Sequence, residues 1–209
     1  MPLKFPLPII YPITSGKTDS DDILRLVRAA VDAEVPLFQI REKSLSGRAL
    51  FDLVVRAVEI TRGSKTRLLV NDRSDIARAA GANGVHLTTQ SLPVEVVRRT
   101  CGAEFVIGVS THSLAEARVA RDQGADFTVF GPVFDTESKR AYGEPQGLEK
   151  LREVTCALDE FPVVAIGGIT LDNVGACFQA GARGVAAIRL LNDAEHMKDR
   201  ISKILAIWT

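Results

Sequence analysis

The chain has 209 residues, with 26 Lys and Arg balanced by 26 Asp and Glu and a hydrophobic share of 46%. This is the composition of an ordinary globular protein, and the length suits one domain or a small α/β barrel. Zero net charge, with basic residues interleaved among acids, disfavours nucleic-acid binding. Apolar runs such as 161–166 fall far short of the roughly 20 residues of a membrane span, so we expect no membrane helix.

The N-terminus and the cysteines indicate a cytoplasmic protein. Residues 1–10 carry three prolines and no small-residue cleavage pattern, so we do not expect a secretory signal. The cysteines at Cys101, Cys156 and Cys177 are odd in number and widely spaced. They fit neither a disulfide framework nor a C-x-x-C metal site, and we predict three buried free thiols.

Eight short apolar runs have the length and β-branched content of buried strands. In chain order they fall at 9–13, 37–40, 67–70, 85–87, 105–108, 127–130, 163–166 and 185–188. Amphipathic stretches typical of helices lie between and after them, at 21–33, 46–61, 93–100, 114–123, 148–158, 171–180 and 193–207. Strand and helix alternate at about 26 residues per unit, which leaves no room for a second domain.

A repeated pattern supports one αβ unit used many times. Gly81, Gly124 and Gly181 each follow a helix end and precede Ala, a short link and an apolar run, as a left-handed helix cap would. The alternative, an open doubly wound sheet, usually has five or six strands and a Gly-rich dinucleotide turn, whereas residues 14–17 read Thr-Ser-Gly-Lys. We predict a single (β/α)8 TIM barrel domain over 1–209, with a short N-terminal extension at 1–8.

Polar residues after the strands should meet at one mouth of such a barrel. Gln39, Arg41 and Lys43 follow the second strand at alternate positions, which predicts that they face one side and bind an anion. A solvated charge cluster is the alternative. Asn71 and Asp72 end the third strand, either as functional groups or as the cap of the next helix, and we favour function because the other strand ends agree.

The histidines differ in their surroundings. Ser110 and His112 follow the fifth strand, where the imidazole could transfer protons and Ser113 could cap the next helix. His86 lies inside the fourth strand and is predicted to be a packed structural residue, and His196 a solvated helix residue. No cluster of His, Cys and acidic residues has the spacing of a zinc site.

The last loops carry groups that suit a phosphate. The long irregular stretch after the sixth strand contains Thr136, Ser138 and Lys139, for which a plain surface loop is the alternative. Gly167 and Gly168 end the seventh strand, where backbone amides could approach a phosphate closely. The eighth strand ends at Ile188 and Arg189, which adds a cation. Barrel phosphate sites often lie at these last two loops, so we expect a phosphorylated small-molecule ligand.

Several motifs together resemble the thiamine phosphate synthase family, in the family's order. They are Gln-Ile-Arg-Glu-Lys at 39–43, Val-Asn-Asp at 70–72, Gly-Val-His-Leu at 84–87, Gly-Val-Ser-Thr-His at 108–112, the loop at 130–139 and Ala-Ile-Gly-Gly-Ile at 165–169. The resemblance runs from about residue 11 to 191. It implies a transferase that joins hydroxymethylpyrimidine diphosphate to hydroxyethylthiazole phosphate and releases pyrophosphate, through a carbocation-like pyrimidine and with the assistance of Mg²⁺.

The resemblance also implies roles for individual residues. The residues that would hold the pyrimidine and its diphosphate are Gln39, Arg41, Lys43, Asn71, Ser110 and Lys139. Asp72 would be a magnesium ligand. Those that would surround the thiazole phosphate are Thr136, Ser138, Gly167, Gly168 and Ile188.

Two positions depart from the family's pattern. Ser91 stands where synthases have an Asp as second magnesium ligand, and a hydroxyl is a poorer Mg²⁺ ligand than a carboxylate. Arg189 stands where the family has a small Ser beside the thiazole phosphate. Arg can bind phosphate, but it changes the shape of that pocket.

These departures keep two alternatives beside the synthase. A sister branch of similar sequence, the TenI-like thiazole tautomerase, also lacks the acidic position and uses a His at the place of His112 to aromatise thiazole carboxylate phosphate. The second alternative is a non-catalytic protein that binds thiazole phosphate or thiamine phosphate. Gln39, Lys43, Asn71 and Asp72 are retained together, which favours the synthase. The sequence leaves the oligomeric state open, a homo-oligomer included.

Overall fold

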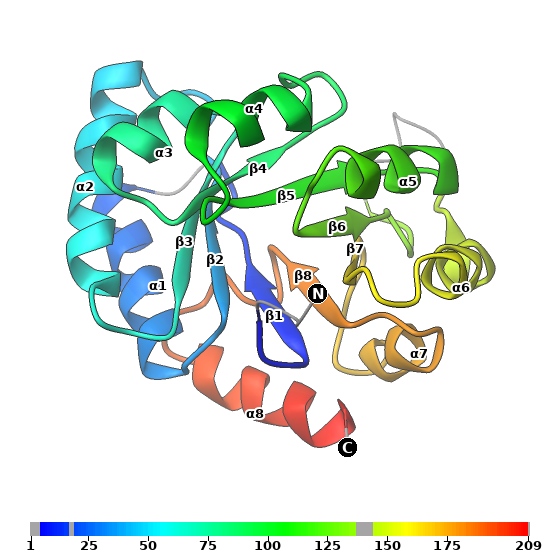
Figure 1. The fold of residues 1–209 in the computed structure, drawn as a ribbon. Coiled ribbons are helices and arrows are strands. Elements are labelled where there is room, and N and C mark those ends of the chain that lie inside the picture. Colours follow the sequence, from blue (N-terminus) through cyan, green and yellow to red (C-terminus); the bar gives the residue numbers. More distant parts are fainter. Residues whose placement is uncertain (1–4, 17–18, 137–143, 209) are drawn as a thin grey trace.

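The computed structural model describes residues 5–16, 19–136 and 144–208, which fold as a (β/α)8 barrel (Figure 1). Its strands are β1 (Ile9–Pro12), β2 (Leu37–Ile40), β3 (Arg67–Asn71), β4 (Gly84–Leu87), β5 (Val106–Thr111), β6 (Phe127–Phe130), β7 (Val163–Ile166) and β8 (Gly184–Ala187). All pairs are parallel, in the order β1-β8-β7-β6-β5-β4-β3-β2. A parallel bridge from Ile13 to Gln39 joins β1 to β2. The predicted TIM barrel is confirmed.

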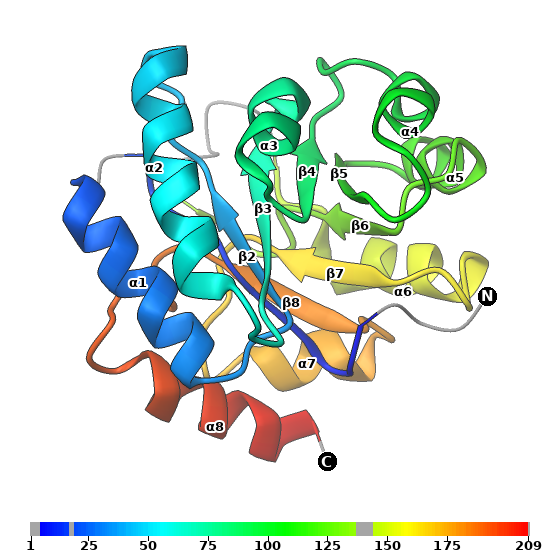
Figure 2. The same cartoon turned by 60° about the vertical axis from the view of Figure 1, so that its left-hand side comes forward.

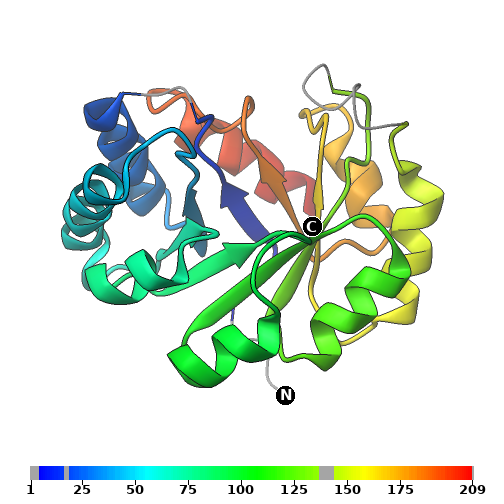
Figure 3. The same cartoon turned by 90° about the horizontal axis from the view of Figure 1, so that it is seen from above.

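The helices form an outer layer around the strands (Figure 3). They are α1 (Ser20–Asp32), α2 (Gly47–Thr61), α3 (Ser74–Ala80), α4 (Val94–Cys101), α5 (Leu114–Asp122), α6 (Gly147–Ala157), α7 (Val174–Gln179) and α8 (Met197–Trp208). Figure 2 shows α1 between α2 and α8, so the last helix closes the outer ring beside the first. Within the described ranges, no helix is both long and apolar enough to cross a membrane.

Several expected boundaries were wrong. No helix is predicted at α3, because its seven residues bury only Ile76 and Ala77 and are too few to show an amphipathic repeat. Strand β5 continues to Thr111, beyond the predicted end at residue 108, because its polar residues Ser110 and Thr111 pair in the sheet like the apolar residues before them. The C-terminal helix begins at Met197, so exposed His196 lies just before it and bonds Asp193 instead of belonging to the helix.

Alternation along the strands separates two apolar cores. One face fills the barrel interior with Phe5, Ile9, Tyr11, Ile13, Leu37, Leu69, Val106, Phe127, Val129, Val164 and Ala186. Their sequence neighbours, among them Ile10, Phe38 and Val70, pack outward against the helices. Because both faces are buried, each strand reads as a nearly continuous apolar run.

The N-terminal extension closes the floor of the barrel. Phe5 is 5% exposed and packs edge-on against Phe127 with 5.7 Å between ring centroids. The Arg67 guanidinium lies 5.4 Å from the centre of the Phe5 ring. An aromatic plug under the strands keeps water out of the interior from this end.

The repeated glycines have the expected conformation, but one cysteine does not have the expected burial. Gly81, Gly124 and Gly181 have φ of 79°, 91° and 90°, in the left-handed region. Cys101 and Cys177 are buried, and burial raises the pKa of Cys177 to about 12. Cys156 is exposed, so the prediction of three buried thiols was wrong there. It lies on the outer face of α6, whereas Leu151, Val154 and Thr155 face the core.

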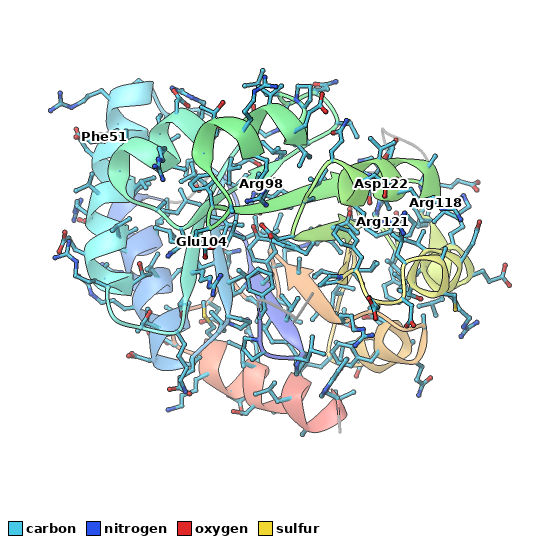
Figure 4. All side chains as sticks on the ribbon, in the orientation of Figure 1. Phe51, Arg98, Glu104, Arg118, Arg121 and Asp122 are labelled. Atoms are coloured by element: carbon cyan, nitrogen blue, oxygen red, sulfur yellow. The ribbon has the colours of Figure 1, made fainter. Side chains whose placement is uncertain are left out.

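A single arginine joins two loops at the floor of the barrel. Arg98 of α4 (Figure 4) donates to the carbonyl oxygens of Gly102, Ala103, Phe105 and Gly124, and to Asp126 Oδ2 at 2.8 Å. Asp126 Oδ2 also accepts from the backbone N of Ile107 at 2.7 Å. The two side chains are 21% and 7% exposed, so the pair is shielded from water and positions the starts of β5 and β6.

Replacing Arg98 with Ala should lower the free energy of unfolding by about 2–4 kcal/mol, because a shielded carboxylate and several carbonyls lose their donor. The neighbouring Arg99→Ala variant is the control. Arg99 is exposed, and its loss should change stability by less than about 0.5 kcal/mol. Urea unfolding measures both, and equal effects would show that Arg98 is not a structural link.

Candidate active site

Parallel strands place all their carboxyl ends at one end of the barrel, and Gln39, Asn71 and Ser110 lie at or near the carboxyl ends of β2, β3 and β5 at this mouth. On β2, Gln39 is 1% exposed, and its Nε2 donates to Asn71 Oδ1 at 3.1 Å. The Gln39 Oε1 is buried and has no hydrogen-bond partner among the described residues. Since buried acceptors are nearly always satisfied, this oxygen marks a place for a donor from a ligand or water.

The cations after β2 occupy different environments. The strand ends at Ile40, and the half-buried Arg41 follows it, with its backbone N donating to Thr14 Oγ1 at 2.8 Å. Lys43 lies in a turn beyond the strand and is exposed, so the strand alternation does not extend to it. Between them Glu42 is buried and accepts from the backbone N of Gly16 at 3.3 Å. The loop therefore presents one shielded and one solvated cation.

The end of β3 does not cap the following helix. Helix α3 has Arg73 at its N-cap position and no side-chain cap, which removes the capping alternative for Asn71 and Asp72. Asp72 is exposed at φ +63°, a left-handed conformation that non-glycine residues seldom adopt. Its backbone N donates to the carbonyl oxygen of His86 at 2.8 Å, which holds this conformation in place.

A buried hydrogen-bonded chain runs through the barrel interior. Tyr11 Oη lies 3.4 Å from His86 Nδ1, and His86 Nε2 lies 2.8 Å from Ser110 Oγ. Burial, and then the charge of Arg41, lowers the pKa of His86 to about 3, so its ring is neutral near pH 7. Burial also raises the pKa of Tyr11 well above its usual value. His86 is packed, as predicted, but it also contacts a residue at the mouth.

His112 has a defined tautomer. Its Nδ1 contacts the carbonyl oxygen of Gly131, which can only accept, so Nδ1 carries the hydrogen and Nε2 is the acceptor nitrogen. The backbone N of His112 donates to Glu116 Oε2 at 2.6 Å. Ser113 caps α5 by accepting from the backbone N of Glu116 at 3.2 Å, as predicted. His112 is exposed and therefore accessible to a ligand.

Ser91 is used by its own loop. Its Oγ accepts from the backbone N of Thr88 at 2.8 Å and lies 3.1 Å from Thr88 Oγ1. No group of three or more His, Cys, Asp or Glu in the described ranges could hold a metal ion. Asp72 is therefore the acidic residue at this part of the mouth to consider for a cation.

The loop after β6 packs against the glycines after β7. The backbone N atoms of Val133 and Phe134 donate to the carbonyls of Ile166 and Gly167 at 2.8 and 3.0 Å. A Cβ on Gly167 would lie 2.5 Å from Pro132, and one on Gly168 would lie 2.7 Å from Phe134 Cβ. The two glycines thus permit close approach of this loop. Thr136 is buried within it, and the predicted site residues Ser138 and Lys139 lie outside the described residues.

Sequence reasoning missed three residues that shape the mouth. Asn192 Nδ2 donates to the carbonyls of Ile13 and Ile188, which ties the ends of β1 and β8 together. Thr14 Oγ1 accepts a hydrogen bond from the backbone N of Arg41, and the Tyr11 hydroxyl is hydrogen-bonded to His86 Nδ1. Tyr11 shares a strand face with Ile9 and Ile13, and that alternation was the available signal. Ile188 is half-buried, and Arg189 beside it is exposed.

The chain is similar to proteins of one family. Residues 10–191 match the family described as thiamine monophosphate synthase. The thiamine-phosphate synthase of Chlorobium luteolum is 37% identical over 200 residues, covering 96% of this chain and 92% of that protein. That of Moorella thermoacetica is 42% identical over 165 residues, covering 79% and 78%. A solved thiamine phosphate pyrophosphorylase from Pyrococcus furiosus has a TM-score of 0.81 and 30% identity, covering 96% and 95%.

The lowered pKa of His86 should make the fold less stable as the pH falls below 6.5, the ordinary value for His. Between 6.5 and about 3 the unfolded chain binds a proton that the folded chain does not, so the free energy of unfolding falls with pH. The slope from this group should approach about 1 kcal/mol per pH unit. Urea unfolding at several pH values measures it. His86→Gln should flatten the profile, and an unchanged slope would contradict the assignment.

Gly168→Ala should destabilise the fold more than Gly63→Ala. Both glycines have positive φ, 66° and 75°, but a Cβ at Gly63 meets nothing within 4 Å. We expect a loss of about 1 kcal/mol at Gly63, from backbone strain, and about 2–4 kcal/mol at Gly168, where a clash adds to it. Thermal unfolding compares the pair. Equal losses would mean that the loop after β6 moves away without cost.

Proposed function

The chain belongs to the thiamine monophosphate synthase family, and we propose that its barrel mouth joins hydroxymethylpyrimidine diphosphate to hydroxyethylthiazole phosphate, giving thiamine phosphate and pyrophosphate. The observation that carries this assignment is the set of ligand-binding groups on the carboxyl ends of neighbouring strands. The Gln39 and Asn71 amides, the Arg41 cation and the Ser110 hydroxyl lie on β2, β3 and β5 or directly after them.

The reaction needs stabilisation of charge more than proton transfer. The bond between the pyrimidine methylene carbon and the diphosphate oxygen breaks, and its electron pair leaves with the diphosphate. The thiazole nitrogen then supplies the electron pair of the new C–N bond. Arg41, Lys43 and the Ser110 hydroxyl would stabilise the negative charge that grows on the leaving diphosphate, which is the kind of contribution that preorganised donors make best.

The amide pair suits the aminopyrimidine. The unpartnered Gln39 Oε1 is a buried acceptor, and an exocyclic amino group supplies N–H donors. The bond from Gln39 Nε2 to Asn71 Oδ1 fixes which end of the amide faces the ligand. Gln39 and Asn71 would therefore orient the pyrimidine ring before its bond to the diphosphate breaks.

The residues present suit a magnesium ion held by one carboxylate. Asp72 supplies it, whereas the Ser91 hydroxyl is engaged with Thr88. Mg²⁺ keeps several waters and often binds through one or two carboxylates and substrate phosphates, so Asp72 together with diphosphate oxygens would be a sufficient set. When bound, the ion would neutralise part of the diphosphate charge.

The last loops would hold the thiazole phosphate. The amides of Gly167 and Gly168, and the chain at Ile188, lie at the loops after β7 and β8, where barrels commonly bind phosphate. Thr136 and Ser138 would add hydroxyls, and Lys139 would face the diphosphate. Arg189 would bring a cation to the thiazole phosphate, at a position where the resemblance implies a small Ser.

Charge balance and fold support a restricted set of partners. We propose that the protein acts as a single cytoplasmic domain on small phosphorylated molecules, without nucleic acid or membrane, as a monomer or a homo-oligomer. A net charge of zero offers no broad basic surface for a polyanion.

A thiazole tautomerase is the second candidate, and the tautomer of His112 favours it. The Nδ1 contact with Gly131 leaves Nε2 as a base that could move a proton on a thiazole ring. The engaged hydroxyl of Ser91 also fits an enzyme that does not use a diphosphate. A family member that binds thiazole or thiamine phosphate without turnover is the third possibility.

The test is formation of thiamine phosphate from the two substrates with Mg²⁺. We expect turnover by the wild type, a loss of kcat/KM of about 10- to 100-fold in Lys43→Ala, and a roughly tenfold lower Mg²⁺ requirement in Ser91→Asp. Thr89→Ala, at an exposed position in the same loop, is the control and should behave as the wild type.

The other outcomes decide between the alternatives. Conversion of thiazole carboxylate phosphate by the wild type and not by His112→Ala, with no thiamine phosphate formed, would replace the synthase with the tautomerase. Binding of thiazole phosphate without turnover in either assay would identify a non-catalytic binder.

A further inference from the structure

The chain of hydrogen bonds from Tyr11 to Ser110 has a direction that follows from the chemistry of its groups. Tyr11 is fully buried, and the described structure gives its hydroxyl one hydrogen bond, to His86 Nδ1 at 3.4 Å. A buried phenolic hydrogen without an acceptor is costly, so Tyr11 donates and Nδ1 accepts. If Nδ1 carried the ring hydrogen, the Tyr11 O–H would have no acceptor among the residues that the structure describes.

The direction continues through the imidazole. His86 is 3% exposed, and its two ring nitrogens lie beside the hydroxyl groups of Tyr11 and Ser110. A buried imidazole between two hydroxyl groups is in its neutral form, with one N–H, because burial disfavours the charged form. Since Nδ1 accepts from Tyr11, that hydrogen is on Nε2, which lies 2.8 Å from Ser110 Oγ. Ser110 therefore accepts from His86, and its own hydrogen is left for a second acceptor.

Ser110 lies where its hydroxyl can donate this hydrogen to an acceptor at the mouth. It is half-buried near the carboxyl end of β5, one residue before the end of the strand. Arg41 directly follows β2 at the same end of the barrel, so a cation also lies at this mouth. An oxygen anion that enters beside Arg41 is the acceptor that this arrangement favours.

We propose that Tyr11 and His86 are positioning residues that hold the Ser110 hydroxyl as a hydrogen-bond donor toward an anionic oxygen of the substrate's diphosphate. This inference rests on the proposed function for the identity of the anion. Neither residue touches the substrate, and both act through Ser110. The reaction consequently depends on a tyrosine deep in the barrel.

The packing around the chain supports a fixed orientation. The Tyr11 and His86 rings lie 5.8 Å apart, and Phe127 contacts both, at 5.5 Å and 6.2 Å between ring centroids. Gly108 faces His86 in the β4–β5 register, and a Cβ there would lie 2.3 Å from Phe127 Cζ. The missing side chain at Gly108 leaves room for the ring that packs beside His86, so a flip of the imidazole would be resisted.

The experiment is a double-mutant cycle on the synthase reaction. Its variants are Tyr11→Phe, His86→Leu and His86→Gln, each made with Ser110 and with Ser110→Ala. We expect Ser110→Ala to lower kcat by about 100-fold, His86→Leu by about 10- to 30-fold and Tyr11→Phe by about three- to tenfold, with KM changed less than about threefold. In the Ser110→Ala background both further losses should shrink to less than about twofold.

His86→Gln and one further variant, Thr128→Val, separate positioning from structural support. His86→Gln places an amide near the position of Nε2, and it should recover most of the kcat lost in His86→Leu. Thr128→Val removes another buried hydroxyl, one that bonds Thr111 Oγ1 and the Val109 carbonyl and alternates with the interior residues Phe127 and Val129. It should lower the melting temperature without changing kcat.

Equal losses with and without Ser110 would overturn the inference, because Tyr11 and His86 would then support only the fold. If His86→Leu does not fold, Tyr11→Phe decides, since it removes one oxygen and keeps the ring.

A wild type that forms no thiamine phosphate would refute the proposed function, and calorimetric binding of pyrophosphate then tests the inference separately. Tyr11→Phe must weaken that binding by about threefold or more when Ser110 is present, and leave it unchanged in Ser110→Ala. Equal binding by all four proteins, or no binding, would overturn it.

Discussion

The barrel closes where the end of β1 meets β2. There the backbone N of Thr14 donates to the Gln39 carbonyl at 3.0 Å, Thr14 Oγ1 accepts from Arg41 N, and Asn192 ties the ends of β1 and β8. These bonds join the two ends of an eight-stranded sheet and, at the same time, fix the first cation of the mouth. Because barrel closure and the site use the same atoms, a substitution that breaks these hydrogen bonds between β1 and its neighbours would disturb both stability and ligand binding.

Inside the ring, apolar packing and polar chemistry are stacked along the barrel axis. Phe5 and Phe127 fill the floor, and Tyr11 and His86 lie next above them. Ser110 and the pair of Gln39 and Asn71 are nearer the mouth. The apolar floor keeps the imidazole neutral, and a neutral imidazole can donate in one fixed direction. The apolar packing at the floor of the barrel therefore supports the hydrogen-bond direction proposed for Ser110 at the mouth.

Ser91 and Arg189, the two positions that differ from the pattern of the family this sequence resembles, lie in loops and not in strands. Ser91 satisfies the backbone of its own turn, so the loop is stable without a metal. The strand residues Gln39, Asn71 and Ser110 are each held by a hydrogen bond to a side chain on a neighbouring strand. Loops can exchange ligand residues at little cost to the fold, and this is where members of one barrel family can differ in chemistry.

Sequence alone determined the alternation of strands and helices, because strands buried on both faces leave short apolar runs and left-handed glycines mark helix ends. It also predicted that Gln39, Asn71 and Ser110 lie at one mouth, since every parallel strand ends on one side of a barrel. It missed α3, which is too short to show a period, and it could not place Lys43, whose turn depends on buried Glu42. The tertiary structure decided which side chains form hydrogen bonds with one another. Tyr11, His86 and Ser110 are 75 and 24 residues apart in sequence, and only closure of the ring brings their hydrogen-bonding atoms together.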